Sequence, residues 1–247
     1  MRNKQKNGFT LVELLIAMVV GLTILLAISS MMDIGLKSSS GAGRKILTQQ
    51  DARAVLDIMA MEIGMASYNP TMSTTIWGTF PTGSCTSIAW PTIGTAKKGI
   101  QVATSDRIVI GMDLTDPPVD PAVIGDSASE YIEYSYVGNT TTGTIFRNIG
   151  GTPGCSGDTA ILGGAGSETM VVNGTVTPLF QYFNVAGTDI SATVIATPNA
   201  TQGNGGIIDI RRIRINIIAD VETQKGSAFR TTRRTYTTDV LVRNHAM

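Results

Sequence analysis

The sequence predicts an α+β protein in which one long N-terminal helix is followed by an antiparallel β-sheet. No proline precedes Pro70, and the apolar residues before it recur at helical spacing. The chain after Pro70 is rich in Thr, Gly, Ser and Pro with short apolar runs, and a strict two-residue alternation appears over Ile213–Val221. With 247 residues, 43% of them hydrophobic, the chain is long enough to bury one core.

The first element is an apolar segment that can cross a membrane. Leu14–Met32 is a run of 19 residues without a charge, about 28 Å long as a helix and close to the thickness of a bilayer core. The bases Arg2, Lys4 and Lys6 precede it, with no acid among them. By the positive-inside rule this cluster keeps the N-terminus in the cytoplasm and sends the rest of the chain outward.

An ordinary secretory signal, cut near Ala27–Ser29, is the alternative interpretation of this segment. Two features count against it. Glu13 lies inside the apolar segment, where a charge costs roughly 2.5 to 3.5 kcal/mol at a helix centre and somewhat less near an end. Gly8 precedes Phe9 and offers an enzyme a peptide bond without a side chain at the cytoplasmic face, and cleavage there leaves the apolar helix attached.

The string Lys6–Ile16, KNGFTLVELLI, resembles the class III signal of type IV prepilins and pseudopilins. The resemblance implies that a prepilin peptidase cuts between Gly8 and Phe9, and that the new Phe9 amine is N-methylated. It also implies that Glu13 neutralises the N-terminal amine of a neighbouring subunit during assembly. The energetics agree with this role, because a lone carboxylate in hydrocarbon is costly and a buried ammonium from a packed neighbour removes most of that cost.

The helix is expected to run from Phe9 to about Ala66, about 87 Å, and to stop at Asn69–Pro70. Ser38–Gly43 has poor helix propensity and predicts a bend or frayed turn, and Gly21 is a second weak point. The expected organisation is a leader at 1–8, a transmembrane assembly helix at 9–32, an amphipathic continuation at 33–68 and a β-rich periplasmic or extracellular domain at 69–247.

The short apolar runs after Pro70 predict strands. They are Arg107–Met112, Tyr131–Val137, Thr144–Ile149, Thr169–Val172 and Pro178–Val185. The alternation over Ile213–Val221 predicts a longer strand, which Gln224–Ser227 turns into a partner strand near Arg230–Arg243. Gly150–Gly166 is expected to be a glycine-rich loop.

Within the pilin group, the stretch Asp51–Ile58 through Glu62–Tyr68 resembles minor pilins of the PilW kind and the related pseudopilin J of type II secretion. Val240–Asn244 resembles the same group more weakly. The resemblance implies that other major and minor pilins, the prepilin peptidase, an inner-membrane assembly platform and membrane lipid are the partners.

Cys85 and Cys155 are the two cysteines of the chain, and the expected topology places both outside the cytoplasm, where disulfides form. We expect them to pair, which contributes on the order of 4 kcal/mol in the chain-entropy model. A metal pair or a reactive thiol is the competing interpretation, but a metal needs three or four ligands, and His245 lies too near the chain end to be favoured as one.

Enzymatic chemistry finds little support in the sequence. His245 is the single histidine, so a Ser-His-Asp or Cys-His site would need it docked, and no G-x-S-x-G or H-E-x-x-H string occurs. Gly150–Gly166 lacks the Lys and Ser/Thr of a phosphate-binding loop. The sequence therefore predicts a non-enzymatic protein without a cofactor.

Asp113, Asp116, Asp120 and Asp126 cluster between apolar stretches, and oxygen-rich loops of this kind can hold Ca²⁺. Their spacing does not match an EF-hand. A solvated acidic loop is the favoured interpretation, and a calcium site is the alternative.

The formal net charge of zero hides an uneven distribution. Residues 66–210 hold four bases against eleven acids, whereas 211–247 hold eight bases against three acids. Basic residues gather on the predicted hairpin and could meet DNA phosphates; they are Arg212, Arg214, Arg230, Arg233 and Arg234. A solvated sheet face is favoured over DNA contact, because few aromatic residues interleave these arginines for stacking on single strands.

The expected function is that of a minor pilin in a type IV pilus, a structural subunit that helps to initiate assembly and lies at or near the tip. The expected location is the inner membrane, crossed once, and then the pilus at the cell surface. The alternatives are a pseudopilin of a type II secretion system and a DNA-uptake receptor pilin that uses the basic hairpin.

Overall fold

The fold is taken from a computed structural model, which describes residues 9–69, 99–114, 130–138, 142–149, 159–164, 166–167, 169–173, 177–198, 200–225 and 228–246. Contacts divide the chain into two compact units. One comprises Met1–Lys45 with Glu222–Thr231, and the other comprises Ile46–Val221 with Thr232–Met247.

Helix α1 spans Leu11–Gly64, 54 residues. The long helix expected from the sequence is confirmed, and it ends two residues before Ala66. Helical structure continues through Ser38–Gly43, where the sequence predicts a bend or frayed turn, and the Ser40 hydroxyl donates to the Lys37 carbonyl at 3.0 Å. After Gly64 the chain leaves the helix through Ser67, whose φ of +65° lies in the left-handed region.

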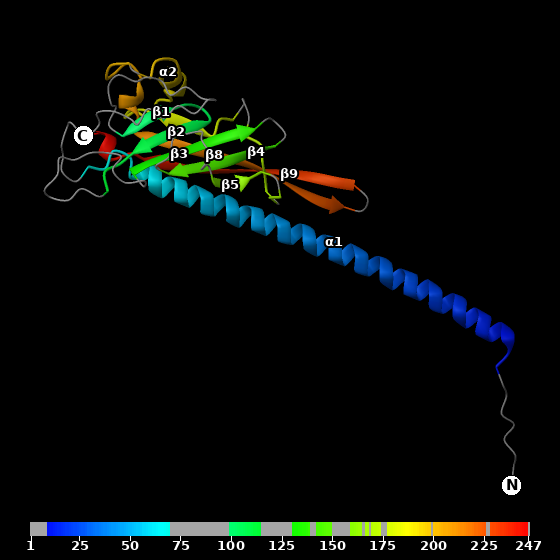
Figure 1. Ribbon diagram of the computed structural model, residues 1–247. Coiled ribbons are helices and arrows are strands. Elements are labelled where there is room, and N and C mark those ends of the chain that lie inside the picture. Colours follow the sequence, from blue (N-terminus) through cyan, green and yellow to red (C-terminus); the bar gives the residue numbers. More distant parts are fainter. Residues whose placement is uncertain are drawn as a thin grey trace, which may run out of the picture. The chain divides into compact units, whose positions relative to one another are not determined.

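Within the described residues, nine strands form one sheet. Figure 1 shows most of these strands beside the C-terminal part of α1. They are β1 (Ile100–Ala103), β2 (Arg107–Gly111), β3 (Tyr131–Gly138), β4 (Gly143–Ile149), β5 (Thr159–Gly163), β6 (Met170–Val171), β7 (Phe180–Phe183), β8 (Arg212–Lys225) and β9 (Ala228–Leu241). The order is β1-β2-β3-β4-β6-β8-β7, with β5 paired to β4 and β9 paired to β8. The pairs with a described register are antiparallel. The short helices are α2 (Ser191–Ala196) and the 3₁₀ turns η2 (Ile207–Asp209) and η3 (Asn244–Ala246).

The five short strands expected from apolar runs and the C-terminal hairpin are present. One expectation is wrong, because β5 lies within Gly150–Gly166, which the sequence analysis assigns to a loop. Its Thr-Ala-Ile-Leu-Gly sequence is too short to show a two-residue period, and pairing with β4 over Thr144–Arg147 holds it as a strand. Strand β1 and helix α2 were also not predicted, for the same reason of length.

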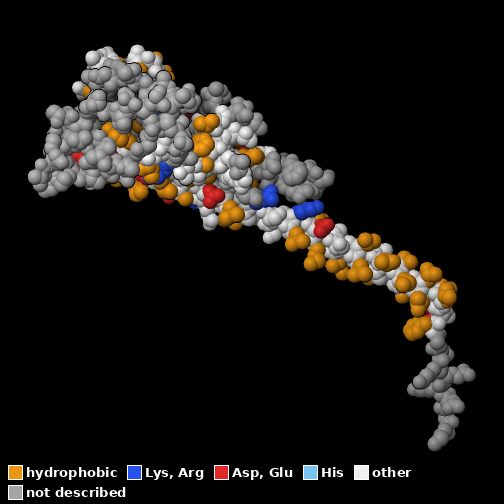
Figure 2. All heavy atoms as spheres, viewed as in Figure 1, with side chains coloured by type: hydrophobic (Ala, Val, Ile, Leu, Met, Phe, Trp, Pro, Cys, Tyr) orange, Lys and Arg blue, Asp and Glu red, His pale blue; other side chains and the backbone are white. Residues whose placement is uncertain are grey.

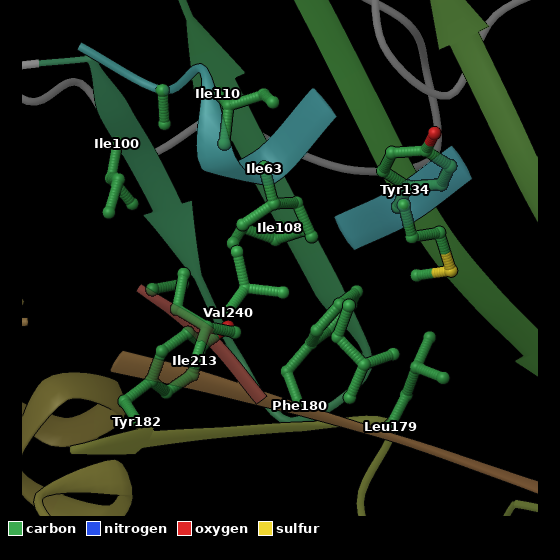
Figure 3. Close-up of a cluster of buried hydrophobic side chains, with 14 of the residues drawn as sticks. Ile63, Ile100, Ile108, Ile110, Tyr134, Leu179, Phe180, Tyr182, Ile213 and Val240 are labelled. Carbon is green, nitrogen blue, oxygen red and sulfur yellow. The ribbon is translucent and has the colours of Figure 1, made fainter. Parts of the chain in front are cut away.

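The core lies between the C-terminal part of α1 and one face of the sheet (Figure 3). From α1 it takes residues at helical spacing, which are Ala52, Val55, Leu56, Met59 and Ile63. Figure 3 shows Ile63 close to Ile108 and Ile110 of β2, and Ile213 of β8 beside Tyr182 and Val240. Burial of each large apolar side chain contributes about 1.5–3 kcal/mol, so this contact holds helix and sheet together. The expected α+β class, a long N-terminal helix packed on an antiparallel sheet, is confirmed.

Candidate functional sites

The first candidate site is the N-terminal turn of α1, where Thr10 and Glu13 form a reciprocal cap. The backbone N–H of Glu13 donates to the Thr10 hydroxyl oxygen at 3.3 Å, and the backbone N–H of Thr10 donates to Glu13 Oε2 at 3.1 Å. The Thr10 hydroxyl also donates to Oε2, at 3.2 Å. This is the capping-box arrangement of Thr-x-x-Glu, which satisfies two backbone donors that a helix start leaves open.

The cap gives the Glu13 carboxylate a partner within its own chain. A carboxylate has about four acceptor positions, and the two hydrogen bonds from Thr10 fall on Oε2, so the group can still accept donors from another molecule. Phe9 lies directly before the cap and is 90% exposed. Gly8, on the other side of the expected cleavage point, lies outside the described residues.

The helix that follows Glu13 presents a largely apolar surface without a charge over Leu14–Met32. Figure 2 shows hydrophobic side chains along the N-terminal part of α1, and none of the residues from Leu11 to Leu36 is buried. Among the described residues, α1 is the one helix long and apolar enough to cross a membrane. Such a surface is stable in hydrocarbon or against other apolar helices.

A second polar site joins α1 to the sheet. Glu62, at 7% exposure, accepts a hydrogen bond from Arg147 Nε of β4 at 2.9 Å and one from the Tyr134 hydroxyl of β3. Burial, and then the hydrogen bond to Glu62, raises the pKa of Tyr134. The hydrogen bond to Glu62 also raises the pKa of Arg147. The phenol therefore stays neutral and the guanidinium stays charged, and the role of the site is to hold the helix on the sheet.

His245 is buried, although it lies close to the chain end. Its Nδ1 lies 3.0 Å from the Ser67 hydroxyl oxygen, and its Nε2 lies 2.9 Å from the Ile207 carbonyl. The imidazole links the end of α1, η2 and η3. Among the described residues no group of three or more potential metal ligands occurs.

The basic residues of the β8–β9 hairpin are largely paired within the chain. Asp239 accepts from Arg212 at 2.7 Å and from Arg214 at 2.8 Å, and both guanidinium groups lie over the Phe183 ring, at 4.0 and 5.1 Å from its centroid. Arg233 makes a two-pronged contact with Asp220, both bonds at 2.9 Å.

Arg234 is exposed and has no ion-pair partner among the described residues. The side chain of Arg230 is not among the described ones. Three of the five arginines considered for DNA contact are thus paired with aspartates of the same hairpin. The choice between a solvated face and DNA contact stays a prediction.

The acidic loop and the cysteines are described only in part. Asp113 is 1% exposed, so it does not belong to a solvated loop, and its backbone N–H donates to the Tyr68 carbonyl at 2.9 Å. The other three aspartates of the calcium hypothesis, Asp116, Asp120 and Asp126, lie outside the described residues, as do Cys85 and Cys155. The calcium site and the disulfide stay predictions.

Sequence reasoning missed the contacts of Thr10, Glu62 and His245. The Thr10 cap was readable, since Thr-x-x-Glu before an apolar run is a helix-start pattern. A glutamate among apolar residues on the buried face of a helix was a weaker signal at Glu62. No local pattern marks His245, because its partners are distant in the sequence.

Comparison with known proteins gives one family match and one similar solved structure. Residues 3–29 match the family described as the prokaryotic N-terminal methylation motif. Among solved structures, a type IV-like pilin from Thermus thermophilus is similar over 81% of this chain and 98% of that chain, with 11% sequence identity and a TM-score of 0.39. The chain has no match among curated proteins. The match confirms that the chain carries a methylation motif; the individual roles of Gly8, Phe9 and Glu13 stay predictions.

Proposed function

We propose that this type IV pilin-like chain is a minor pilin of the PilW kind, which helps to initiate pilus assembly and lies at or near the tip. The observation that carries the proposal is the N-terminal methylation motif, placed on an exposed apolar helix whose first turn holds the Glu13 carboxylate. An exposed apolar helix of this kind is unfavourable in a soluble protein, and in a simple membrane anchor the carboxylate adds an energetic cost without a function.

The proposed sequence of events follows from the chemistry of that turn. The apolar part of α1 inserts into the inner membrane with the basic leader in the cytoplasm. Prepilin peptidase removes residues 1–8, and methylation of the Phe9 amine keeps it a cation. The capping bonds of Glu13 lower the cost of holding its charge at the membrane until a neighbouring subunit brings its own N-terminal ammonium.

A place at or near the tip is supported by size. Removal of an eight-residue leader from 247 residues leaves a β-rich head and a 54-residue helix, which is bulky for a subunit repeated along a fibre. A subunit that occurs only a few times, at one end of the fibre, does not have to pack against copies of itself along the fibre, so its bulk is tolerated there. The proposed partners are the other pilins and the inner-membrane assembly platform.

Deletion of the gene in its own host tests the proposal. We expect surface pili to fall to a small fraction of the wild-type number, counted by electron microscopy, and to return on complementation. Trace amounts of the mature chain should appear in sheared pili by immunoblotting. Normal pili together with a loss of protein secretion would overturn the proposal in favour of a type II secretion pseudopilin.

A further inference from the structure

Strand β9 forms one lateral edge of the sheet. It pairs with β8, while β6 and β7 pair with β8 along its other edge. No described strand or loop donates backbone hydrogen bonds to the outer edge of β9. Thr232–Leu241 contains no Pro, which is a common device for protecting an edge strand.

The register of the β8–β9 pair follows from three side-chain contacts. Arg233 bonds Asp220, Thr237 bonds Asn216 at 3.1 Å, and Asp239 bonds Arg214. In each pair the two residue numbers have the same sum, as antiparallel partners must. The backbone bond from Val242 to Arg211, at 3.0 Å, continues the same register.

The directions of the N–H and C=O groups in β8 then determine the directions of these groups in β9. The N–H of Asn216 donates to Leu179 beside β7 at 2.8 Å, and the N–H of Ile218 donates to the Asn173 side chain at 3.0 Å. Both point away from β9. Because successive residues of a strand point their N–H and C=O groups to opposite sides, the residues of β9 opposite them point away from β8. These residues are Arg233, Thr235, Thr237 and Asp239.

The same four side chains are exposed, so the outer edge and the outer face of β9 are open together. Charged residues near this edge are taken from 212–221 and 232–243, which leaves out the hairpin end 222–231. These two stretches hold five arginines and two aspartates, which are Arg212, Arg214, Arg233, Arg234, Arg243, Asp220 and Asp239. Both aspartates are already bonded to arginines. The field at the edge is therefore positive, and Arg234 is available to an incoming carboxylate.

We propose that the outer edge of β9, over Thr232–Leu241, is a β-augmentation site for an extended acidic segment of a partner polypeptide. Main-chain hydrogen bonds to the four outward residues supply affinity, and carboxylates facing Arg233 and Arg234 select the partner. A second copy of this chain is a poor occupant, because its own edge is positive and its two aspartates are engaged.

A synthetic peptide tests the site on the full chain in detergent micelles. The probe is a fluorescein-labelled strand former of alternating Glu with Thr or Val, and the control is the same peptide with Lys in place of Glu. Binding is measured by fluorescence anisotropy at low salt. Amide hydrogen exchange of the unlabelled complex shows which backbone groups become protected.

Two variants separate backbone pairing from charge. Thr235→Pro removes an outward N–H without removing a bond to β8, and Arg234→Glu reverses a charge without touching the backbone. Arg53→Glu, at an exposed position of α1, is the matched control for charge. Thermal melting of each variant shows whether it folds. If Thr235→Pro does not fold, the binding measured for Arg234→Glu tests the proposal.

The proposal expects the Glu peptide to bind, the Lys peptide not to bind, and exchange to slow at Arg233, Thr235 and Thr237. Thr235→Pro and Arg234→Glu should each weaken binding by about tenfold, and Arg53→Glu should not. Equal binding of the Glu and Lys peptides, or binding without slower exchange in β9, would overturn it. So would a duplex oligonucleotide that binds in preference to the Glu peptide and loses affinity on Arg234→Glu, which would assign the edge to nucleic acid.

Discussion

Glu62 of α1 and Arg147 of β4 form an ion pair that joins the helix to the sheet, with Arg147 Nε donating to Glu62 Oε2 at 2.9 Å. The Glu62 side chain is 9% exposed and the Arg147 side chain 23%. The Tyr134 hydroxyl donates to the same carboxylate. The ion pair lies beside the apolar contact between α1 and the sheet. It therefore helps to fix the position of α1 along the sheet.

Replacement of Arg147 by Met should destabilise the protein by about 2–3 kcal/mol, since it leaves a buried carboxylate without its cation. The double variant Glu62→Gln with Arg147→Met should recover most of this loss, because a neutral amide still accepts from Tyr134. Chemical denaturation in detergent micelles, followed by circular dichroism, measures both. An equal loss in the single and double variants would show that packing of the arginine stem, and not its charge, matters.

The Asp239 cluster makes stability depend on pH. Hydrogen bonding from Arg214, and then from Arg212, lowers the pKa of Asp239. A carboxyl group with a depressed folded-state pKa stabilises the fold above its ordinary pKa of about 3.9, and this stabilisation is lost as the pH falls through the folded-state pKa. The wild type should therefore have a higher Tm than Asp239→Asn at about pH 6, and this difference should disappear below about pH 4. A difference that widens in acid would contradict this account.

Two buried phenols should respond in opposite ways to loss of the hydroxyl group. The Tyr182 hydroxyl donates to the Thr104 carbonyl at 2.7 Å, so Tyr182→Phe should cost about 1 kcal/mol. The Tyr236 hydroxyl is buried without a hydrogen-bond partner among the described residues, so Tyr236→Phe should be neutral or stabilising by up to about 1 kcal/mol. Thermal melting of the two variants side by side gives the comparison, and similar losses in both would contradict it.

The cap at the start of α1 should be measurable as local stability. Thr10→Ala removes the hydroxyl that accepts from the Glu13 N–H and should cost about 1 kcal/mol, which corresponds to roughly fivefold faster exchange of that amide. Thr10→Ser keeps the hydroxyl and serves as the control. Amide exchange by NMR in micelles is the measurement; unchanged exchange in Thr10→Ala would mean that the lipid or detergent environment alone holds the turn.

The helix and the C-terminal hairpin were predictable from the sequence because each carries a long period. Ala52, Met59 and Ile63 repeat at helical spacing, and Ile213, Ile215 and Ile217 alternate. Strand β5 carries neither pattern and exists because β4 offers it hydrogen-bonding partners. Short elements whose stability comes from tertiary pairing leave little trace in a single sequence.

The site residues divide in the same way. Glu13 stands out because a charge within an apolar run is expensive, and the local pattern around it is enough to single it out. Glu62 and His245 depend on partners far along the chain, Arg147 and Ile207, and only the fold brings those together. The pairing of Arg233 with Asp220 likewise needed the register of the hairpin.

The proposed role of Glu13 in assembly is tested most directly by Glu13→Gln, which keeps the shape of the side chain and removes its charge. Asp57→Asn, at an exposed carboxylate in the C-terminal part of α1, is the matched control. Mass spectrometry of the membrane fraction should find both variants cut before Phe9 and methylated. Immunoblots of sheared pili should then find Asp57→Asn at the wild-type level and Glu13→Gln absent or nearly so, whereas wild-type amounts of Glu13→Gln in pili would contradict the account.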